Sequence, residues 1–361
     1  MKRMLILVVI AMLSGPLFAD EAILVDFSLL AADIRVKVSE NDESDKPNQN
    51  RQTLMDFSHV AGGSFTKEQK NTMKTSLAIE NWEVTLASSA RNVGNMSRSY
   101  TREATSKEKW GENVKVMGVR IHFPVEPHHS WAMIKPPFDI PAFEPPAEIS
   151  DDGEITSSED QDGITSPSRF ESQGKDDNDK PLPAYGVVKN VGIIREVAVN
   201  VYGLNFPHSL SVILIDSEGK SRNIFIDFLQ FDGWRERKWV NPAYMEEVRN
   251  REIRLYPLYP TSTPFVKFGG LLIQRDGSKP GGDFIAYFKD VRIIYDKAVL
   301  NPERDIDDEG LWNIIYQRES ARKVWEMERF GQNQVLRYLE QQKKATDIPF
   351  GHPDRPENQD Q

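Results

Sequence analysis

The chain of 361 residues contains no cysteine. Disulfide bonds therefore cannot stabilise the fold, and metal sites that use thiolate ligands are excluded. The six histidines do not compensate, because the adjacent pair His128 and His129 lacks the spacing with which two histidines bind zinc from one helix. We expect neither a metal nor another cofactor, and a fold that depends on its hydrophobic core alone.

Long hydrophobic runs are also missing, except at the N-terminus. There, Lys2 and Arg3 precede an apolar run over residues 4–13 that is too short to span a bilayer, and Ala19 offers a small residue at a cleavage point. The pattern predicts a signal peptide over residues 1–19 that is cut after Ala19. An uncleaved membrane anchor is the alternative, and we expect no stable membrane insertion of the mature chain.

An excess of positive charge and the motifs of nucleotide-binding enzymes are absent as well. The chain has 45 Lys and Arg residues against 55 Asp and Glu residues, a net charge of −10. Such an acidic chain is a poor partner for nucleic acid or for an anionic membrane surface. The sequence contains no phosphate-binding P-loop, no dinucleotide fingerprint and no Gly-x-Ser-x-Gly nucleophile elbow.

What the sequence does contain is a series of short segments in which apolar and polar residues alternate. In the first, Trp82, Val84 and Leu86 alternate with Glu83 and Thr85. This period of two is typical of strands with one buried and one exposed face. Turn-forming residues separate the segments, which predicts an all-β fold with an antiparallel β-sandwich or jelly roll over residues 20–302. The segments are 82–88, 119–123, 197–203, 211–216, 223–229, 265–273 and 291–296.

One segment inside the predicted sandwich has a different composition. Residues 144–180 include 12 acidic and 3 basic residues and very few large apolar ones. Such a segment cannot bury enough apolar surface to offset its chain entropy, so we predict an acidic disordered insertion over about residues 144–183. It is either a tolerated surface loop or an acidic tail for a basic partner.

After residue 302 the hydrophobic period changes from two to between three and four. This change predicts a C-terminal helical segment over residues 303–345, followed by a flexible tail over residues 346–361. A first helix is expected from about Asp307 to Phe330 and a second over residues 333–344, with Gly331 between them. The apolar residues either dock on the sandwich or form a partner surface. They include Leu311, Ile315 and Trp325 in the first helix, and Val335, Leu336 and Leu339 in the second.

The segment 227–242 places aromatic residues among packed charges. It could be a sugar-binding platform or one face of a sandwich. Because side chains alternate along a strand, Trp234 and Trp239 should face opposite sides, so a single flat platform is not expected. We interpret Phe228 and Trp234 as core or sheet-edge packing. We predict that Trp239, Arg235 and Arg237 contact a partner, because Trp and Arg dominate interface anchors.

Two further uses of the acidic side chains stay open. Asp227 and Glu236 flank the aromatic segment and could be the pair of carboxylates that a glycosidase requires, although their spacing is not specific. Asp283, Asp290 and Asp296 lie near predicted strand ends and could bind calcium, although acids at turns often serve solvation alone.

Four stretches of the chain together resemble the spirochaetal flagellar filament outer-layer proteins, the FlaA family. They are residues 114–144, 186–219, 228–242 and 328–344. The resemblance implies a jelly roll related to carbohydrate-binding modules and export to the periplasm. It also implies assembly on periplasmic flagella, as a sheath around a core of flagellins. Trp131, in the first stretch, joins the partner-binding candidates.

Three functions are compatible with these observations, because a fold does not decide a function. The first is a structural sheath subunit that tunes filament stiffness and curvature and binds core flagellins and other sheath subunits. The second is a periplasmic glycan-binding module, and the third is a glycan-active enzyme of the same fold. Without a convincing acid pair or a coplanar aromatic platform, we expect the first function and no enzymatic activity.

Overall fold

The computed structural model describes thirteen parts of the chain: residues 19–34, 49–58, 65–67, 70, 73–107, 109–111, 113–143, 147–149, 155–157, 168–172, 185–253, 263–298 and 306–344. The predicted signal peptide, apart from Ala19, and the predicted C-terminal tail lie outside these residues. Among the helices of the described part, none combines the length and the hydropathy needed to cross a membrane.

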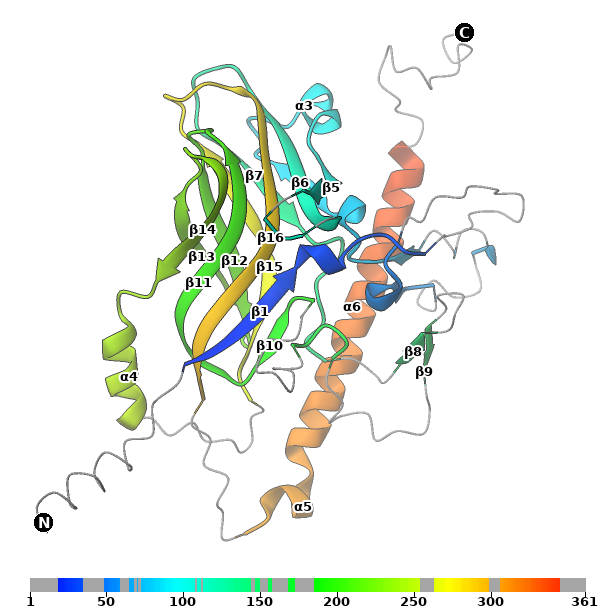
Figure 1. Cartoon of the computed structure of the whole chain (residues 1–361). Helices are drawn as coiled ribbons and strands as arrows, with labels where there is room; N and C mark the ends of the chain where they lie inside the picture. Colours follow the sequence, from blue (N-terminus) through cyan, green and yellow to red (C-terminus); the bar gives the residue numbers. More distant parts are fainter. Residues whose placement is uncertain are drawn as a thin grey trace, which may run out of the picture.

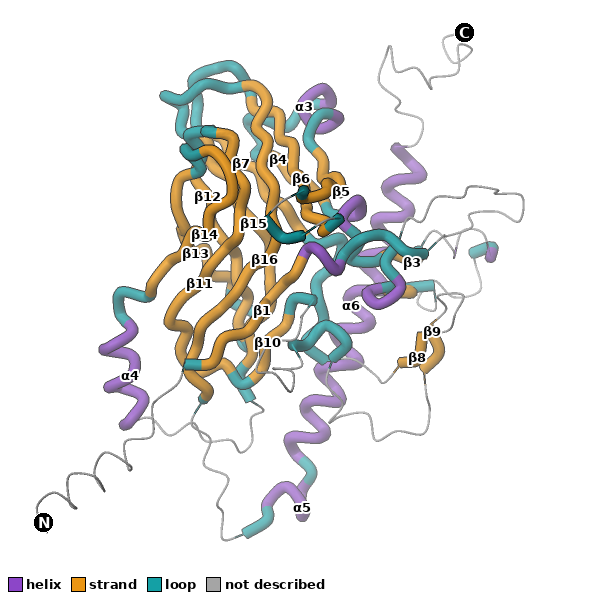
Figure 2. The backbone as a smooth tube through the Cα atoms, in the orientation of Figure 1, coloured by secondary structure: helices purple, strands orange, loops and turns teal. Residues whose placement is uncertain are grey.

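Two antiparallel sheets form the body of the molecule (Figure 2). In the first sheet the strand order is β14-β11-β16-β6-β5, and β1 also pairs with β16. These strands are β14 (Asp232–Val240), β11 (Val191–Leu204), β16 (Gly282–Lys297), β6 (Val114–Phe123), β5 (Tyr100–Ser106) and β1 (Asp20–Asp26).

In the second sheet the order is β13-β12-β15-β7-β4, and β10 also pairs with β15. The strands are β13 (Ser221–Phe228), β12 (Ser209–Asp216), β15 (Phe265–Arg275), β7 (Ser130–Lys135), β4 (Glu83–Leu86) and β10 (Val187–Lys189). Each of the seven segments with alternating residues overlaps one of these strands. The predicted antiparallel β-sandwich is therefore confirmed.

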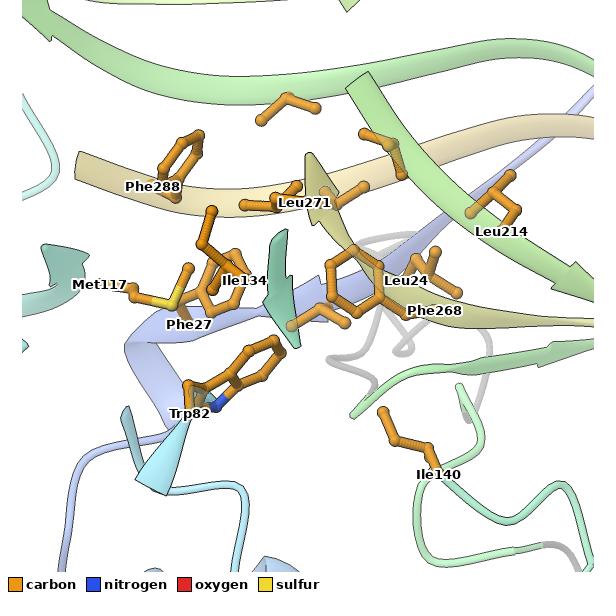
Figure 3. Close-up of a cluster of buried hydrophobic side chains, with 14 of the residues drawn as sticks. Leu24, Phe27, Trp82, Met117, Ile134, Ile140, Leu214, Phe268, Leu271 and Phe288 are labelled. Atoms are coloured by element: carbon orange, nitrogen blue, oxygen red, sulfur yellow. The ribbon is translucent and has the colours of Figure 1, made fainter. Parts of the chain in front are cut away.

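The hydrophobic core lies between the two sheets, where the apolar positions of both sets of strands meet (Figure 3). The rings of Phe27 and Trp82 meet edge to face with centroids 5.4 Å apart, and Trp82 lies 5.9 Å from Phe268. The indole Nε1 of Trp82 donates a hydrogen bond to the carbonyl of Leu77 at 2.9 Å, so its buried polar group is satisfied. Packing of this kind stabilises the sandwich without disulfides.

Short elements surround the sheets. Two hairpins are formed by β2 (Met55–Asp56) with β3 (Lys74–Thr75), and by β8 (Ala147–Ile149) with β9 (Ile155–Ser157). Within the described residues, the helical elements before the C-terminal segment include α3 (Val93–Ser97) and α4 (Tyr244–Ile253), and the short 3-10 turns η1 (Phe27–Leu29), η2 (Arg51–Thr53) and η4 (Ile79–Asn81).

The prediction of disorder throughout residues 144–183 is wrong for residues 168–172. Phe170 is fully buried in the core, and the guanidinium of Arg169 donates a hydrogen bond to the carbonyl of Leu54 at 2.9 Å. The average composition of residues 144–183 does not reveal the buried Phe170, because one aromatic residue hardly changes an average over forty positions. Residues 144–146, 150–154, 158–167 and 173–184 lie outside the described residues.

The C-terminal segment is helical as predicted, but it breaks at a different residue. It consists of α5 (Asp308–Trp312) and α6 (Ile314–Lys344), and α6 continues through Gly331. The predicted break at Gly331 is wrong, because a glycine inside a helix costs only about 1 kcal/mol relative to alanine and does not by itself end the helix. The break falls at Asn313, whose backbone is left-handed with φ of 50°.

The start of α6 is stabilised by a side chain from α5. The carboxylate of Glu309 accepts hydrogen bonds from the backbone N–H groups of Ile315 and Tyr316, at 3.0 and 2.9 Å. These N–H groups belong to the first turn of α6, where no earlier helical carbonyl can accept them. Glu309 therefore fixes the angle at which the two helices meet, and α6 then runs along one side of the sandwich (Figure 1).

Candidate functional site

Strand β14 carries three of the predicted partner-binding residues, and all three face the interior side of the first sheet. Trp239, Arg237 and Arg235 lie directly opposite the buried residues Val197, Val199 and Val201 of β11. Residues directly opposite each other in an antiparallel pair share a face of the sheet. Trp239 is accordingly half-buried and packs against the core.

The two arginines of this set cover the edge of the core. The guanidinium groups of Arg237 and Arg235 lie 4.6 and 5.2 Å from the centre of the Phe231 ring. Arg237 also forms an ion pair with Asp227 at 3.1 Å. Of the two arginines, Arg235 is exposed and Arg237 is half-buried. Since Glu236 lies on the opposite face of β14 from Arg237, Asp227 and Glu236 do not face a common cleft as a glycosidase pair would.

Of the two alternatives for Trp234, core packing is wrong and sheet-edge packing agrees with the structure, because Trp234 lies on β14, the edge strand of the first sheet. It lies opposite Tyr202 on the outer face of the first sheet and is half-buried there. Its ring contacts those of Tyr202 and Trp110 edge to face, at 5.5 and 5.8 Å, and Tyr202 contacts Tyr287 at 5.8 Å. These rings stand at steep angles to one another, so they form a cluster and not a flat platform.

Sequence reasoning missed Trp110, Tyr202 and Tyr287, because the cluster depends on strand register. Tyr202 lies opposite both Trp234 and Tyr287, and Tyr287 lies opposite Gly118. A Cβ atom at Gly118 would lie only 3.2 Å from the Tyr287 ring, so the glycine leaves room for that ring. The alternation in segment 197–203 puts Tyr202 on the face opposite Val197, Val199 and Val201, but the pairing that brings Tyr202 to Trp234 and Tyr287 was not visible.

Phe228 was also interpreted as core or sheet-edge packing, and the structure contradicts the core alternative. Its side chain is 56% exposed at the end of β13, the edge strand of the second sheet. Its ring contacts that of the exposed Phe225, with centroids 5.4 Å apart. Trp131, a predicted partner-binding residue, is 40% exposed on the outer face of the same second sheet. Three exposed aromatic side chains, Phe225, Phe228 and Trp131, therefore share the outer face of the second sheet.

The three aspartates considered for calcium are each held by neighbouring polar groups. Asp283 forms an ion pair with Arg120 at 2.9 Å, and this contact is the main reason why the pKa of Asp283 is lowered. Asp290 accepts a hydrogen bond from Asn200 at 2.8 Å. Asp296 accepts one from the Tyr244 hydroxyl at 3.0 Å. Their contacts show structural roles on the first sheet.

Helix α6 is anchored to the second sheet through polar side chains. Arg322 donates a hydrogen bond to the carbonyl of Ser217 at 2.9 Å, lies 4.8 Å from the centre of the Phe265 ring and pairs with Glu326 at 3.4 Å. Two turns after Arg322, Arg329 pairs with Asp139 at 3.2 Å. The helix therefore docks by its charged face.

A buried lysine lies beneath this part of the helix. Lys267 of β15 is 7% exposed, and burial lowers its pKa, while the nearby negative charges of Glu326 and Asp139 act in the opposite direction. Glu326 itself is 4% exposed. A buried charge is stable only when it is compensated, so the helix must stay in place to keep Lys267 and Glu326 together.

The apolar residues of the C-terminal helices differ in exposure. Ile314, Ile315 and Val335 are half-buried, and the side chain of Leu339 lies outside the described part of the chain. We call the exposed large apolar residues of the two helices the helix surface. Exposed apolar surface of this extent is typical of an interaction site. The helix surface consists of Leu311, Trp312, Tyr316, Val324, Trp325 and Leu336, with exposed fractions between 45% and 68%.

Solved structures that resemble the chain include carbohydrate-binding modules. One belongs to the β-sandwich superfamily, with 7% identity, a TM-score of 0.26, and coverage of 60% of this chain and 57% of that one. Another is bound to β-1,4-galactotriose, with 7% identity, a TM-score of 0.24, and coverage of 59% and 88%. A likeness at this level has no bearing on function.

The sequence relatives are far more similar. The flagellar filament outer layer protein of Treponema pallidum is 45% identical over 353 residues, which cover 97% of this chain and 96% of the relative. The protein of the same name from Spirochaeta aurantia is 38% identical, with 92% and 90% covered. The one from Borreliella burgdorferi is 28% identical, with 91% and 89% covered.

The family model for the flagellar filament outer layer protein FlaA matches residues 46–304. This range contains almost the whole sandwich, and the relatives extend the similarity over the C-terminal helices as well. The chain therefore belongs to the FlaA family of flagellar filament outer layer proteins.

Proposed function

We propose that this protein is a structural subunit of the flagellar outer layer, which it forms by packing side-on against a core of flagellins and against neighbouring subunits of the same layer. The observation that carries the proposal is the helix surface. Six large apolar side chains stay exposed on α5 and α6, while Arg322 and Arg329 fix α6 to the sandwich. A docked helix that leaves such side chains in solvent can present them to a partner.

The energetics of a layer favour many modest contacts over one strong contact. A single helix surface offers a small area, so one subunit on its own would dissociate quickly. Along a filament each subunit meets the core and its neighbours at the same time, and the combined attachment becomes much longer-lived than any single contact. A layer bound in this way adds material at the greatest distance from the filament axis, where it changes stiffness and curvature most.

The proposed role also has consequences for where the protein is located and for whether it is an enzyme. The family places the protein at the flagellum, and we infer export to the periplasm through a signal peptide cleaved after Ala19. The role needs no turnover, so we infer that the protein is not an enzyme. Trp131, Trp239, Arg235 and Arg237 remain predicted partner contacts, and Arg235 is the most accessible of the three on β14.

The test is a sedimentation assay with flagellar filaments from which the outer layer has been stripped. The full mature protein should bind and sediment with them. A variant with Trp312→Ser, Trp325→Ser and Leu336→Ser should lose at least tenfold in apparent affinity, because its exposed apolar anchors are removed.

The matched control is Val93→Ser on α3, which changes an apolar side chain that is 62% exposed but far from α6 in the chain. It should sediment like the unchanged protein. Equal binding by the triple variant would refute the helix surface as the site of attachment. Filaments that keep the same bending stiffness with and without the layer would refute the mechanical role.

A further inference from the structure

A cavity of about 420 Å³ lies on the outer face of the second sheet, at the end away from α6. Its walls and floor come from four neighbouring strands and the adjoining loops. Trp131 of β7 and Phe225 and Phe228 of β13 form the aromatic sides, and Ser209 of β12 and Gln274 of β15 lie between them. The volume is within the range of small-ligand sites.

Strand register places these residues in one row. Phe228 lies opposite Ser209, Ser209 lies opposite Gln274, and Gln274 lies opposite Trp131. Directly opposite residues share a face, so the row reads aromatic, hydroxyl, amide, aromatic across the sheet. The polar groups in the middle are only weakly engaged with each other, since the single contact from the Ser209 hydroxyl to Gln274 Oε1 is 3.4 Å long.

The charged residues at the cavity do not favour an anion. Arg275 is 2% exposed, and its guanidinium donates to the backbone carbonyls of Pro124, Glu126 and Lys279 at 2.6 to 3.1 Å. Its donors are therefore already occupied. Asp276 adds a carboxylate, which repels phosphate and carboxylate groups. The remaining chemistry is neutral, with polar groups between aromatic sides.

We propose that this cavity binds a neutral saccharide. A sugar ring has apolar C–H faces that pack on aromatic rings and hydroxyl groups at its edges that bond with amides and hydroxyls, which matches the row from Phe228 to Trp131. A purely apolar protein segment would bury Ser209 and Gln274 without hydrogen bonds, at a cost in affinity. The geometry is fixed in advance, because Arg275 ties the β15–β16 loop to the β6–β7 loop.

This site is separate from the helix surface, so the two proposals can fail independently. The experiment is isothermal titration of the full mature protein with chitotriose, cellotriose and maltotriose, each at up to about 10 mM. At least one probe should bind with a Kd in the millimolar range or below. Trp131→Ala and Phe228→Ala should each weaken that binding at least tenfold.

The matched control is Trp234→Ala, which removes a half-buried tryptophan from the outer face of the first sheet. Near-ultraviolet circular dichroism identifies variants that fail to fold, and Gln274→Ala gives a milder change on the same row. No binding of any probe by the unchanged protein overturns the proposal. Equal loss with Trp234→Ala overturns the location. If Trp131→Ala abolishes filament attachment while no probe binds, the cavity is a protein docking site and the saccharide proposal is wrong.

Discussion

The two ends of the outer face of the second sheet differ in how they are covered. Along β15, Phe265 and Lys267 alternate with the core residues Val266 and Phe268 and lie under α6, where both are buried. At the other end of the same strand, Gln274 is exposed beside the cavity. One face of one strand is thus completed by the chain itself at one end and left open at the other.

Burial in this protein therefore follows from what lies over the sheet and not from the residue type. Phe265 is 1% exposed and Phe225 is 47% exposed, although both are phenylalanines on the second sheet. The covered end contributes to stability, and the open end is available for ligands. Substitutions at the two ends should therefore affect different measurements.

The largest difference is expected from matched phenylalanine truncations. Phe265→Ala should destabilise the protein by about 3–5 kcal/mol, because it removes a buried ring that also supports Arg322. Phe225→Ala at the open end should change the free energy of unfolding by about 0.5 kcal/mol or less. Urea unfolding curves of the two variants measure both values. Similar losses would contradict the division of the face into covered and open ends.

The second prediction concerns acid stability at the open end. His208 precedes the cavity residue Ser209 and is buried among Phe123, Phe206 and Phe284, and this burial, with a smaller effect of Arg275, lowers its pKa from 6.5 to about 4. The unfolded chain therefore takes up a proton at a higher pH than the folded protein does. Stability is fully present above pH 6.5 and should fall by about 3 kcal/mol between pH 6.5 and pH 4.

The variant His208→Leu removes the titrating group and replaces it with an apolar side chain of similar size. Its unfolding free energy, measured at intervals from pH 7 to pH 4, should lack the component that His208 contributes, so the two curves should converge or cross toward low pH. Parallel curves would show that His208 keeps an ordinary pKa in the folded protein.

A smaller effect is expected where the helix meets the sheet. Arg322→Ala should remove the hydrogen bond to Ser217 and the contact with Phe265, which together contribute about 1–3 kcal/mol to docking of α6. Hydrogen exchange should accelerate in α6 and hardly change in β11 and β16. The comparison variant Arg318→Ala removes another arginine of α6. It tests whether the faster hydrogen exchange depends on Arg322 or follows the loss of any arginine on this helix. Uniform acceleration in all strands would mean that α6 and the sandwich unfold together.

The smallest effect on stability is expected from Trp325→Ala on the helix surface. Its side chain is 57% exposed, so the free energy of unfolding should change by about 0.5 kcal/mol or less. Attachment to stripped filaments should nevertheless weaken. Phe265→Ala should instead destabilise the protein while leaving the exposed side chains of the helix surface unchanged. The contrast between the two variants separates stability from assembly. A large loss of stability would place Trp325 in the fold instead.

Several features of the fold could be predicted because they are local. The alternation in segments such as 197–203 and 211–216 predicted strands, and the change of period after residue 302 predicted helices. The family was recognised from stretches that include these strands. The partner-binding residues stay a prediction: Trp131 and Leu336 are exposed, as a partner contact requires, whereas Trp239 packs against the core.

Periodicity and composition are properties of the local chain, so they were sufficient to predict an antiparallel sandwich without disulfides that is followed by helices. Which side of each strand faces inward depends on how the strands pair. A period of two places Trp234 and Trp239 on opposite faces, but pairing with β11 sets which of them points to the core. In the same way, the packing of α6 through Arg322 and Arg329 leaves Val324, Trp325 and Leu336 exposed, and no local pattern shows this.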